Sequence, residues 1–509
     1  MSRSFLRPAR SAHPDRSGSG RPDRSGHPAA PDRAAASGGA AAGSGGAAGS
    51  GGAAGSGGAA GSGGTASRGL GSRLPRLALT ASIASLALLV TACGGGDGRA
   101  AGAAGSAGGP GTADRPVTVT YWSSSAGAQQ TVDAFNKTHP NIRVAFSAIP
   151  GGPDGAAKLA NAVKGGNAPD IATMDYSALP EFASGGNLED LTGTSGKLVG
   201  EKFPQAVQSL VTLGGKTWAV PFDVTPLELF YRKDIFEKHG VTVPKTWDEY
   251  KAAAEKINRA DPSVRITNFG GGDPAVLAGL AWQAGAKWYG VEGDQWKVAI
   301  NDPASKKVAE YWNGLMASGL ASKTPLWGEG EAKERSSGQV ATIVGAAWTA
   351  GTLLANYPDL KGKWGVAPLP TWDGTPATGM YGGTSYIVPK GSKQTKAAAE
   401  FITWVTTEPE AIKARLSSLK APSSALPANP EMRAEAAKLF DASYFDGQNP
   451  YALAGEAAAT ILPGWTWGPA HLQVNSAQNA AGPDLVKALS EGQVAAEKAI
   501  KDRGLGLAD

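Results

Sequence analysis

Alternating apolar and polar side chains at residues 117–122 have the period of a half-buried β-strand. Similar short strand patterns return at 141–146 and 171–174. Between them, 129–138 and 156–164 carry apolar side chains at helical spacing. A strand–helix–strand order of this kind predicts a mostly parallel sheet with helices on both faces, and therefore an α/β fold.

The pattern changes after residue 226, where helices become more frequent. Thr246 followed by Glu249 predicts a capped helix start, and helical spacing then dominates to residue 320. We expect one long helix or a helix pair at 483–501. The remaining predicted elements are strands at 227–231, 340–344, 364–367 and 385–388, and a helix at 397–406.

The first 66 residues have almost nothing apolar to bury. From residue 43 to 60 the hexapeptide GSGGAA repeats three times. Such a composition cannot build a packed core. We therefore interpret 1–66 as a disordered low-complexity leader.

A single cysteine, Cys93, follows an apolar run of 14 residues at 77–90. That run is too short to cross about 30 Å of hydrocarbon comfortably, but it fits the apolar core of a secretory signal preceded by arginines. Cys93 after Val-Thr-Ala resembles a bacterial lipobox. We expect a signal peptide at 67–92, lipidation of Cys93, and a flexible tether at 93–115 that holds the protein on the outer face of the cytoplasmic membrane.

Charge is unevenly placed along the chain. Residues 1–92 have a net charge of +7, and the remaining residues, with 38 basic and 41 acidic side chains, have a net of −3. The folded part therefore lacks the positive charge that nucleic-acid binding needs. His139, His239 and His471 show no metal-ligand spacing, so we expect no metal and no cofactor.

Four groups of short motifs follow one another in the folded part. They are TYW at 120–122 with Phe135 and PNIRV at 140–144; GNAPDI at 166–171 with FASGGNLEDL at 182–191; GKTWAVP at 215–221 with LFYRKD at 229–234 and PKTWDE at 244–249; and WGVAPLP at 364–370 with GGTSY at 382–386. In this order they resemble the family 1 extracellular solute-binding proteins of carbohydrate ABC transporters, the group of maltose-binding protein. Arg232 departs from the Asn that is common there.

The resemblance implies a type II periplasmic-binding-protein fold, in which a hinge joins two discontinuous lobes around a cleft. Lobe 1 is expected at 116–223 plus about 370–420, and lobe 2 at about 224–369 plus 421–509. Prolines favour extended backbone. Crossing segments are therefore expected near 222–226 and 368–371, with a third near 420–430.

A sugar presents flat C–H faces and a rim of hydroxyls, so its site needs aromatic platforms and hydrogen-bonding groups. Trp465 and Trp467 lie between Gly/Pro pairs, which helix cores rarely contain, and Trp348 follows a predicted strand. The candidate platforms are Trp122, Trp282, Trp348, Trp465 and Trp467. We expect Trp218, Trp247, Trp312, Trp364 and Trp404 in the core instead.

Polar candidates come from strand ends and from the first crossing. Asp175 follows the third predicted strand, where parallel sheets place their ligands. Asp223 lies at the first crossing, where it either lines the cleft or makes a hinge hydrogen bond. Gln129 or Gln130 could point an amide from a helix start at the cleft. Gly382 and Gly383 could allow close ligand approach, the alternative being a simple turn.

The sequence thus predicts a non-enzymatic, monomeric lipoprotein that binds a carbohydrate and delivers it to ABC transporter permease subunits. One alternative keeps the fold but changes the solute to a polyamine, an amino acid or a glycerol phosphate. Another is a secreted polysaccharide-active enzyme, because carboxylates are plentiful. No nucleophile motif such as GxSxG accompanies them.

Overall fold

The computed structural model describes residues 111–417 and 425–508. They belong to one compact unit that spans Arg99–Asp509. The expected leader, the expected signal peptide and Cys93 lie outside the described residues, as does most of the expected tether. Within the described ranges, no helix combines the length and the apolarity needed to cross a bilayer.

Lobe 1 is built on a five-stranded sheet in the order β2-β1-β3-β15-β6. β1 pairs in parallel with both β2 and β3, as predicted, whereas β15 runs antiparallel to β3 and to β6. The strands are β1 (Val117–Ser123), β2 (Ile142–Ala148), β3 (Ile171–Asp175), β6 (Val220–Pro221) and β15 (Thr384–Ile387), and β4 (Thr212–Leu213) pairs with β5 (Lys216–Thr217) beside them.

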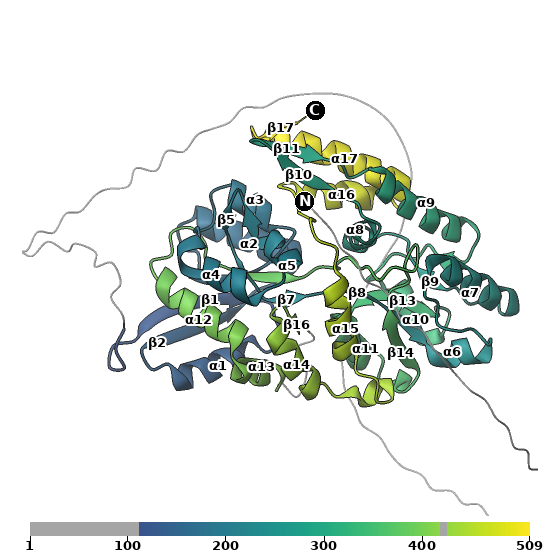
Figure 1. The fold of residues 1–509 in the computed structure, drawn as a ribbon, viewed down its shortest axis with the longest axis horizontal. Coiled ribbons are helices and arrows are strands. Elements are labelled where there is room, and N and C mark those ends of the chain that lie inside the picture. The colour runs from purple at the N-terminus through teal and green to yellow at the C-terminus, as the bar shows by residue number, and fades with distance from the viewer. Residues whose placement is uncertain (1–110, 418–424, 509) are drawn as a thin grey trace, which may run out of the picture. The chain divides into compact units, whose positions relative to one another are not determined.

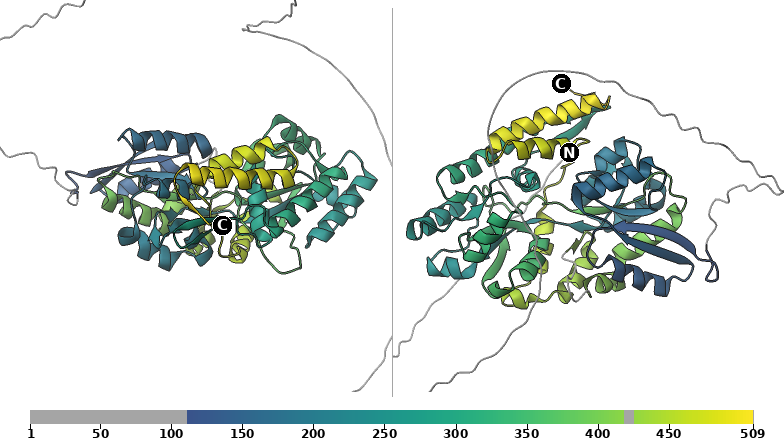
Figure 2. Two further views of the ribbon diagram at one scale, coloured as in Figure 1. Left: turned by 90° about the horizontal axis from the view of Figure 1, so that it is seen from above. Right: turned by 180° about the vertical axis from the view of Figure 1, so that it is seen from behind.

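Helices cover the sheet of lobe 1 (Figures 1 and 2). Tyr121 of the sheet and Phe135 of the first helix both pack against Phe401, which lies in a later helix of the lobe. Phe401 thereby closes the core on that side. The helices are α1 (Ala128–Thr138), α2 (Gly152–Lys164), α3 (Leu179–Ser184), α4 (Thr192–Lys202), α5 (Gln205–Val211), α12 (Thr395–Thr407) and α13 (Pro409–Leu416).

Lobe 2 has an antiparallel three-stranded sheet in the order β13-β8-β14. Phe230 of the central strand packs with Trp364 and Phe445 in a separate small core on one face. The strands are β8 (Leu227–Arg232), β13 (Thr342–Ala346) and β14 (Trp364–Pro368), with the short pairs β9 (Thr267–Asn268) and β12 (Ala321–Ser322), and a small sheet of β10 (Tyr289–Glu292), β11 (Gln295–Val298) and β17 (Gly506–Leu507).

Most helices after residue 232 belong to lobe 2. Thr246 caps α7 by accepting a hydrogen bond from the Glu249 N–H, as predicted, and the expected C-terminal helix is the single α17. The helices are α6 (Lys233–Lys238), α7 (Trp247–Ala260), α8 (Pro274–Gln283), α9 (Pro303–Ala317), α10 (Glu329–Ser337), α11 (Ala347–Asn356), α15 (Pro450–Ala457), α16 (His471–Ala480) and α17 (Leu485–Asp502), with 3-10 turns η1 (Pro358–Leu360), η2 (Ala442–Phe445) and η3 (Ala458–Thr460).

Three neighbouring segments carry the chain between the lobes. β7 (Asp223–Val224) pairs with β16 (Leu426–Pro427), and Pro226 forms a β-bridge with Met380. The chain passes between the lobes at these two places, and the lobe boundaries expected from the sequence stay predictions. α14 (Pro430–Leu439) follows β16 and packs against both α13 and α15.

The second crossing lies later than the sequence indicates. The segment 368–371 stays in lobe 2, where Thr371 bridges Thr246 and the Gln283 amide donates to the Pro370 carbonyl at 2.8 Å. The prolines there shape a lobe 2 loop over α8. The chain crosses only at Met380 and Tyr381. The Tyr381 N–H donates a hydrogen bond to the Thr225 carbonyl of the first crossing.

Within the described part of the chain, an ion pair joins the lobes away from these crossings. Arg503, just after α17, donates to Glu181 of α3 at 2.6 Å, and both side chains are about three-quarters buried. In Figure 1, the end of α17 and α3 lie on the side of the lobes away from α14.

Candidate functional site

An open pocket with about 520 Å³ of empty space lies at the carboxyl ends of β1, β2 and β3. Lobe 1 contributes Ser124 after β1, the start of α2 and Asp175. Lobe 2 contributes His471 and Leu472 from the beginning of α16. This is the edge at which α/β sheets bind ligands. We refer to it as the strand-end pocket.

Asp175 is the only carboxylate among the described residues that line the strand-end pocket. No donor among the described residues hydrogen-bonds to its side chain. Burial, together with the negative charges of Asp223 and Asp273, raises the pKa of Asp175 to about 6. A carboxylate held in this way can accept hydrogen bonds from a ligand.

The glycine-rich start of α2 forms another wall of the pocket, at Gly151, Gly152 and Pro153. Gly152 has a φ of 59° and open space around its Cα. The first backbone N–H groups of a helix have no partner within the helix, so a ligand oxygen can use them. The sequence analysis missed this segment, although it follows β2 directly and the strand-end rule applies to it as well.

An aromatic cluster of lobe 2 surrounds Asp273, the N-cap of α8. The Tyr381 hydroxyl donates to Asp273 Oδ2 at 2.6 Å, and the Trp327 indole donates to the same oxygen at 2.9 Å. Trp348 lies between the two rings, 5.5 Å from Trp327 and 5.0 Å from Tyr381 between ring centroids. Tyr381 comes three residues before Thr384, which pairs with Asp175 and lines the strand-end pocket, so the chain leads directly from the cluster to that pocket.

The side chain of Trp327 is unusually exposed to solvent for a tryptophan. The side chain is 51% exposed and the backbone φ is 65°, a region that bulky residues rarely occupy. Glu331 accepts a hydrogen bond from the Trp327 N–H at 2.6 Å and fixes this conformation. Strain of this kind is characteristic of ligand-contacting positions. The sequence analysis missed Trp327, Tyr381 and Asp273, although Trp327 precedes a glycine, a framing similar to the one that drew attention to Trp465.

Trp348 is partly buried in the first turn of α11, directly after β13, and its indole donates to the Tyr381 carbonyl at 3.2 Å. Its ring is therefore held in place while one neighbour, Trp327, stays accessible. The role of Trp348 as a platform stays a prediction that the geometry makes reasonable.

The structure places Trp282 and Trp465 in the core of lobe 2. Their rings stack face to face with centroids 5.0 Å apart, and both are almost completely buried. Trp467 is also buried, but it lines a small hollow together with Trp288 and His471. The Gly/Pro framing correctly indicated a loop, yet this loop folds back onto α8, so Trp282 and Trp465 have no free face for a ligand.

Trp122 and Gln129 lie away from the strand-end pocket. The Trp122 ring is covered by Lys158 of α2, whose Nζ is 5.1 Å from the ring centroid. Gln129 is exposed on α1 and donates to Asp133 of the same helix at 2.8 Å. Neither side chain is placed to meet a ligand in that pocket.

Asp223 makes the hinge hydrogen bonds that were its alternative role. Its carboxylate accepts from both the backbone N–H and the hydroxyl of Thr384, at 2.6 and 3.0 Å. Burial raises the pKa of Asp223 to about 6, and the bonds from Thr384 oppose that rise. Asp223 thus ties the first crossing to β15, while Thr384 itself lines the strand-end pocket.

Gly382 and Gly383 have φ values of 80° and 105°, which disfavour side chains. A Cβ on Gly383 would lie 2.9 Å from the ring of Tyr176. The close approach that Gly383 permits is therefore to Tyr176, within the protein. Gly382 has open space around it.

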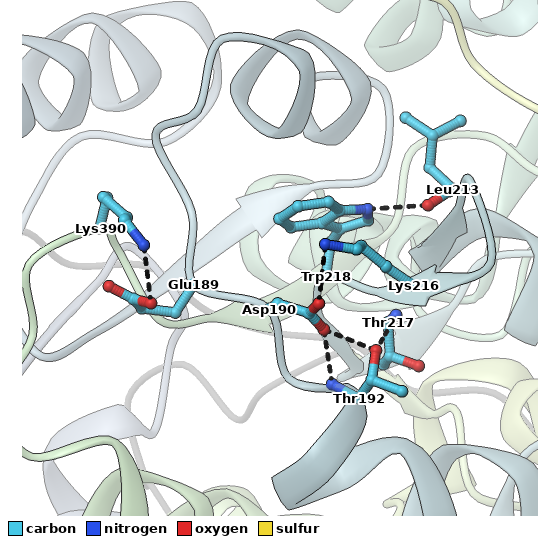
Figure 3. Close-up of polar contacts among 8 residues, drawn as sticks. All are labelled: Glu189, Asp190, Thr192, Leu213, Lys216, Thr217, Trp218 and Lys390. Atoms are coloured by element: carbon cyan, nitrogen blue, oxygen red, sulfur yellow. Dashed lines mark hydrogen bonds and ion pairs between the residues drawn. The ribbon is translucent and has the colours of Figure 1, made fainter. Parts of the chain in front are cut away.

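The motifs at 182–191 and 215–221 hold the edge of lobe 1 together (Figure 3). Asp190 accepts hydrogen bonds from Thr192, at the start of α4, and pairs with Lys216 at 3.2 Å. The Trp218 indole donates to the Leu213 carbonyl at 3.0 Å. These residues stabilise the fold and do not belong to the pocket.

The tryptophans expected in the core are mostly there. Trp247, Trp312 and Trp364 are at most 1% exposed. Trp218 and Trp404 are partly buried and pack against the main core, where Trp404 meets the edge of Phe135 at 5.3 Å. Among the described residues, no group of His, Cys, Asp and Glu has the arrangement of a metal site.

Two lobes, each assembled from separate stretches of chain and joined by three crossings beside a pocket, define a bilobal binding protein. The chain belongs to the bacterial extracellular solute-binding protein family, whose model matches residues 121–412. The fold class expected from the sequence is thereby confirmed.

Named relatives of this chain bind oligosaccharides. It is 27% identical over 314 residues to the arabinooligosaccharide-binding protein of Bacillus subtilis, a match that covers 58% of this chain and 70% of that protein. Its fold is similar to the ABC transporter associated binding protein of B. animalis subsp. lactis in complex with beta-1,6-galactobiose, with 27% identity, a TM-score of 0.66 and coverage of 78% and 100% of the two chains. The galacto-N-biose-/lacto-N-biose I-binding protein of Bifidobacterium longum, in complex with lacto-N-biose, gives 28% identity, a TM-score of 0.67 and coverage of 77% and 99%.

Proposed function

We propose that this chain captures a neutral mono- or oligosaccharide between its lobes and delivers it to the permease subunits of an ABC transporter. The observation that carries the proposal is the unpaired carboxylate of Asp175 in the strand-end pocket. The aromatic cluster around Asp273 supports it, because its Tyr381 comes three residues before Thr384, the β15 residue that pairs with Asp175. Membership of the solute-binding family and the sugar-binding relatives support it.

The chemistry of the two sides is complementary. The Asp175 carboxylate can accept hydrogen bonds from sugar hydroxyls, and the N–H groups at the start of α2 can donate to them. Trp327 and Trp348 can cover the apolar C–H face of a sugar ring. Burial lowers the pKa of His471, the titratable lobe 2 residue of the strand-end pocket, to about 4. The pocket therefore has no cationic side chain at neutral pH among its described residues, which disfavours phosphates.

The arrangement argues for binding without catalysis. A typical glycosidase needs two carboxylates that are free to transfer a proton and to act as nucleophile or base. Here Asp273 accepts from Trp327 and Tyr381, and Asp223 accepts from Thr384, so both serve the scaffold. Asp175 is left as the single free carboxylate of the strand-end pocket. Oligosaccharides incubated with the protein should therefore be recovered intact.

The location follows from the family and from the N-terminal sequence. The family is extracellular. We add that Cys93 carries a lipid that anchors the monomeric protein to the outer face of the cytoplasmic membrane. The 14-residue apolar run before Cys93 supports this anchor.

Calorimetric titration with a panel of neutral disaccharides and trisaccharides tests the proposal. At least one sugar should bind stoichiometrically and quench or shift tryptophan fluorescence. Asp175→Ala should weaken that binding by at least tenfold, whereas Asp133→Ala, on the exposed face of α1, should leave it unchanged. If no sugar binds and a polyamine or amino acid does, the proposed ligand class is wrong.

A further inference from the structure

A second pocket opens between the start of α8, the end of α16 and the start of α17. It is open to solvent, and about 340 Å³ of space in and around it is free of protein atoms. Its walls are mostly apolar, with Phe269, Leu326 and Leu485 among them, and its polar side chains include Gln478 and Asp273. We call it the Gln478 pocket.

Gln478 is the unexplained residue of this pocket. Its side chain is 3% exposed, and neither the amide nitrogen nor the amide oxygen has a hydrogen-bond partner in the described part of the chain. It lies against Gly492 of α17, where a Cβ would come within 3.0 Å of the amide nitrogen. A buried amide without partners destabilises a folded protein, so such a group is expected to meet a ligand or a water.

The Gln478 pocket borders the proposed sugar site. Asp273 lines the pocket and also accepts hydrogen bonds from Trp327 and Tyr381 of the aromatic cluster. Leu326 on its wall directly precedes Trp327. The Gln478 pocket and the aromatic cluster therefore share Asp273, and a substituent of a sugar ring on Trp327 would have to reach the pocket past this residue.

The lining selects among substituents. A carboxylate or sulfate would meet the negative charge of Asp273, and a lone hydroxyl would leave the apolar walls uncovered. An acetamido group offers a methyl to the walls, while its N–H and C=O match the acceptor and the donor of a primary amide.

We propose that the Gln478 pocket receives the acetamido group of an N-acetylated amino sugar, and that Gln478 makes the protein prefer such sugars. This rests on the proposed function, because the sugar ring must lie in the cleft. It adds a specificity determinant in a pocket that is separate from the strand-end pocket.

The test compares sugar pairs that differ only in an acetamido group against a hydroxyl, namely N,N′-diacetylchitobiose with cellobiose and N-acetyllactosamine with lactose. In at least one pair, the acetamido sugar should bind the wild-type protein at least tenfold more tightly by titration calorimetry. Gln478→Leu should abolish that preference and change the affinity for the hydroxyl sugar less than twofold. Gln473→Leu, on the exposed side of the same helix, should preserve the preference.

Thermal unfolding without sugar keeps the result interpretable. Because Gln478→Leu removes an unpaired buried amide, it should not lower the melting temperature; if branching prevents folding, Gln478→Met gives the same comparison with an unbranched side chain. Equal binding of both members of each pair, or a preference that survives both substitutions, overturns the inference and leaves the pocket with a resident water. If none of these sugars binds but other neutral sugars do, the inference also fails while the proposed function stands.

Discussion

Arg503 donates to Glu181 across the gap between the lobes, at 2.6 Å, with both side chains about three-quarters buried. Arg503 follows α17 of lobe 2, and Glu181 lies on α3 of lobe 1. Since the three crossings form the hinge elsewhere, this pair can hold the lobes together only while they are close.

The first prediction concerns the release of sugar. Arg503→Ala should raise the dissociation rate about two- to tenfold, because a partly buried pair that stabilises the closed form contributes on the order of 1 kcal/mol. Stopped-flow tryptophan fluorescence measures the rate. Lys498→Ala removes an exposed pair within α17 and should have no effect. If the double exchange Arg503→Glu with Glu181→Arg fails to restore a slow rate, the ion pair is not the cause.

The second prediction separates platform from core tryptophans. Trp348→Ala should cost about 2–4 kcal/mol of sugar affinity, as the loss of a central aromatic contact does. Trp404→Ala should leave affinity nearly unchanged and lower the free energy of unfolding by about 2–3 kcal/mol, because it removes packing against Phe135. Calorimetry measures the affinity and denaturant unfolding the stability. If Trp348→Ala binds the sugar as tightly as the wild type and Trp404→Ala does not, the proposed position of the cleft is wrong.

The third prediction uses the exposure of Trp327. Trp327→Ala should weaken sugar binding about tenfold and leave the melting temperature almost unchanged, because half of the ring is already in water. Trp327→Gly should weaken binding equally and also relieve the positive φ. A variant that binds as tightly as the wild type would remove Trp327 from the site.

The fourth prediction is a pH dependence of stability. Burial raises the pKa of Asp175 to about 6 in the folded protein, so between about pH 4 and pH 6 the folded state keeps a proton that the unfolded state has lost. The stabilisation that this proton gives is complete below about pH 4 and is lost as the pH rises through about 6. Asp175→Asn should therefore increase stability at pH 7 by about 1–2 kcal/mol, allowing for the solvent that still reaches the carboxylate. The gain should shrink toward pH 4.

Differential scanning fluorimetry between pH 4 and pH 8 checks this dependence, and Glu400→Gln, at an exposed carboxylate of α12, is the control. The same Asp175→Asn protein should bind sugar more weakly than the wild type. A variant that is less stable than the wild type at pH 7 would show that Asp175 serves the fold and not a ligand.

The fifth prediction concerns Cys93, outside the described residues. Cys93→Ala should release the protein into the medium or leave an uncleaved precursor, because the lipid attachment point is lost. Fractionation of cells and mass spectrometry of the N-terminus distinguish these results. Unchanged retention on the membrane, with a mature N-terminus elsewhere, would contradict the anchor.

Local patterns were sufficient for much of the fold. The alternation at 117–122 and 141–146 correctly predicted β1 and β2, because the two-residue period of a strand can be recognised within a few neighbouring residues. The second crossing could not be read in this way. Prolines at 368–371 indicate extended backbone, but only the bridge between Pro226 and Met380 shows where the chain changes lobe.

The site was harder to predict, because it depends on which faces of loops meet. Asp175 could be located from the strand-end rule alone. Trp282 and Trp465 were candidate platforms and Trp327 was not, because only tertiary packing makes the first two stack on each other and leaves Trp327 exposed. Asp273 takes its importance from hydrogen bonds to residues 54 and 108 positions away, which no local pattern records.

The position of β15 in the sheet of lobe 1 also governs when that lobe can form. β15 joins β3 to β6, yet it comes after the whole β13-β8-β14 sheet of lobe 2 in the chain, and β17, which completes the small sheet of lobe 2, comes later still. A polypeptide that emerges from its N-terminus cannot complete either sheet until most of its length is available, and such distant pairings form slowly. The strand order therefore delays completion of both sheets until most of the chain has been made.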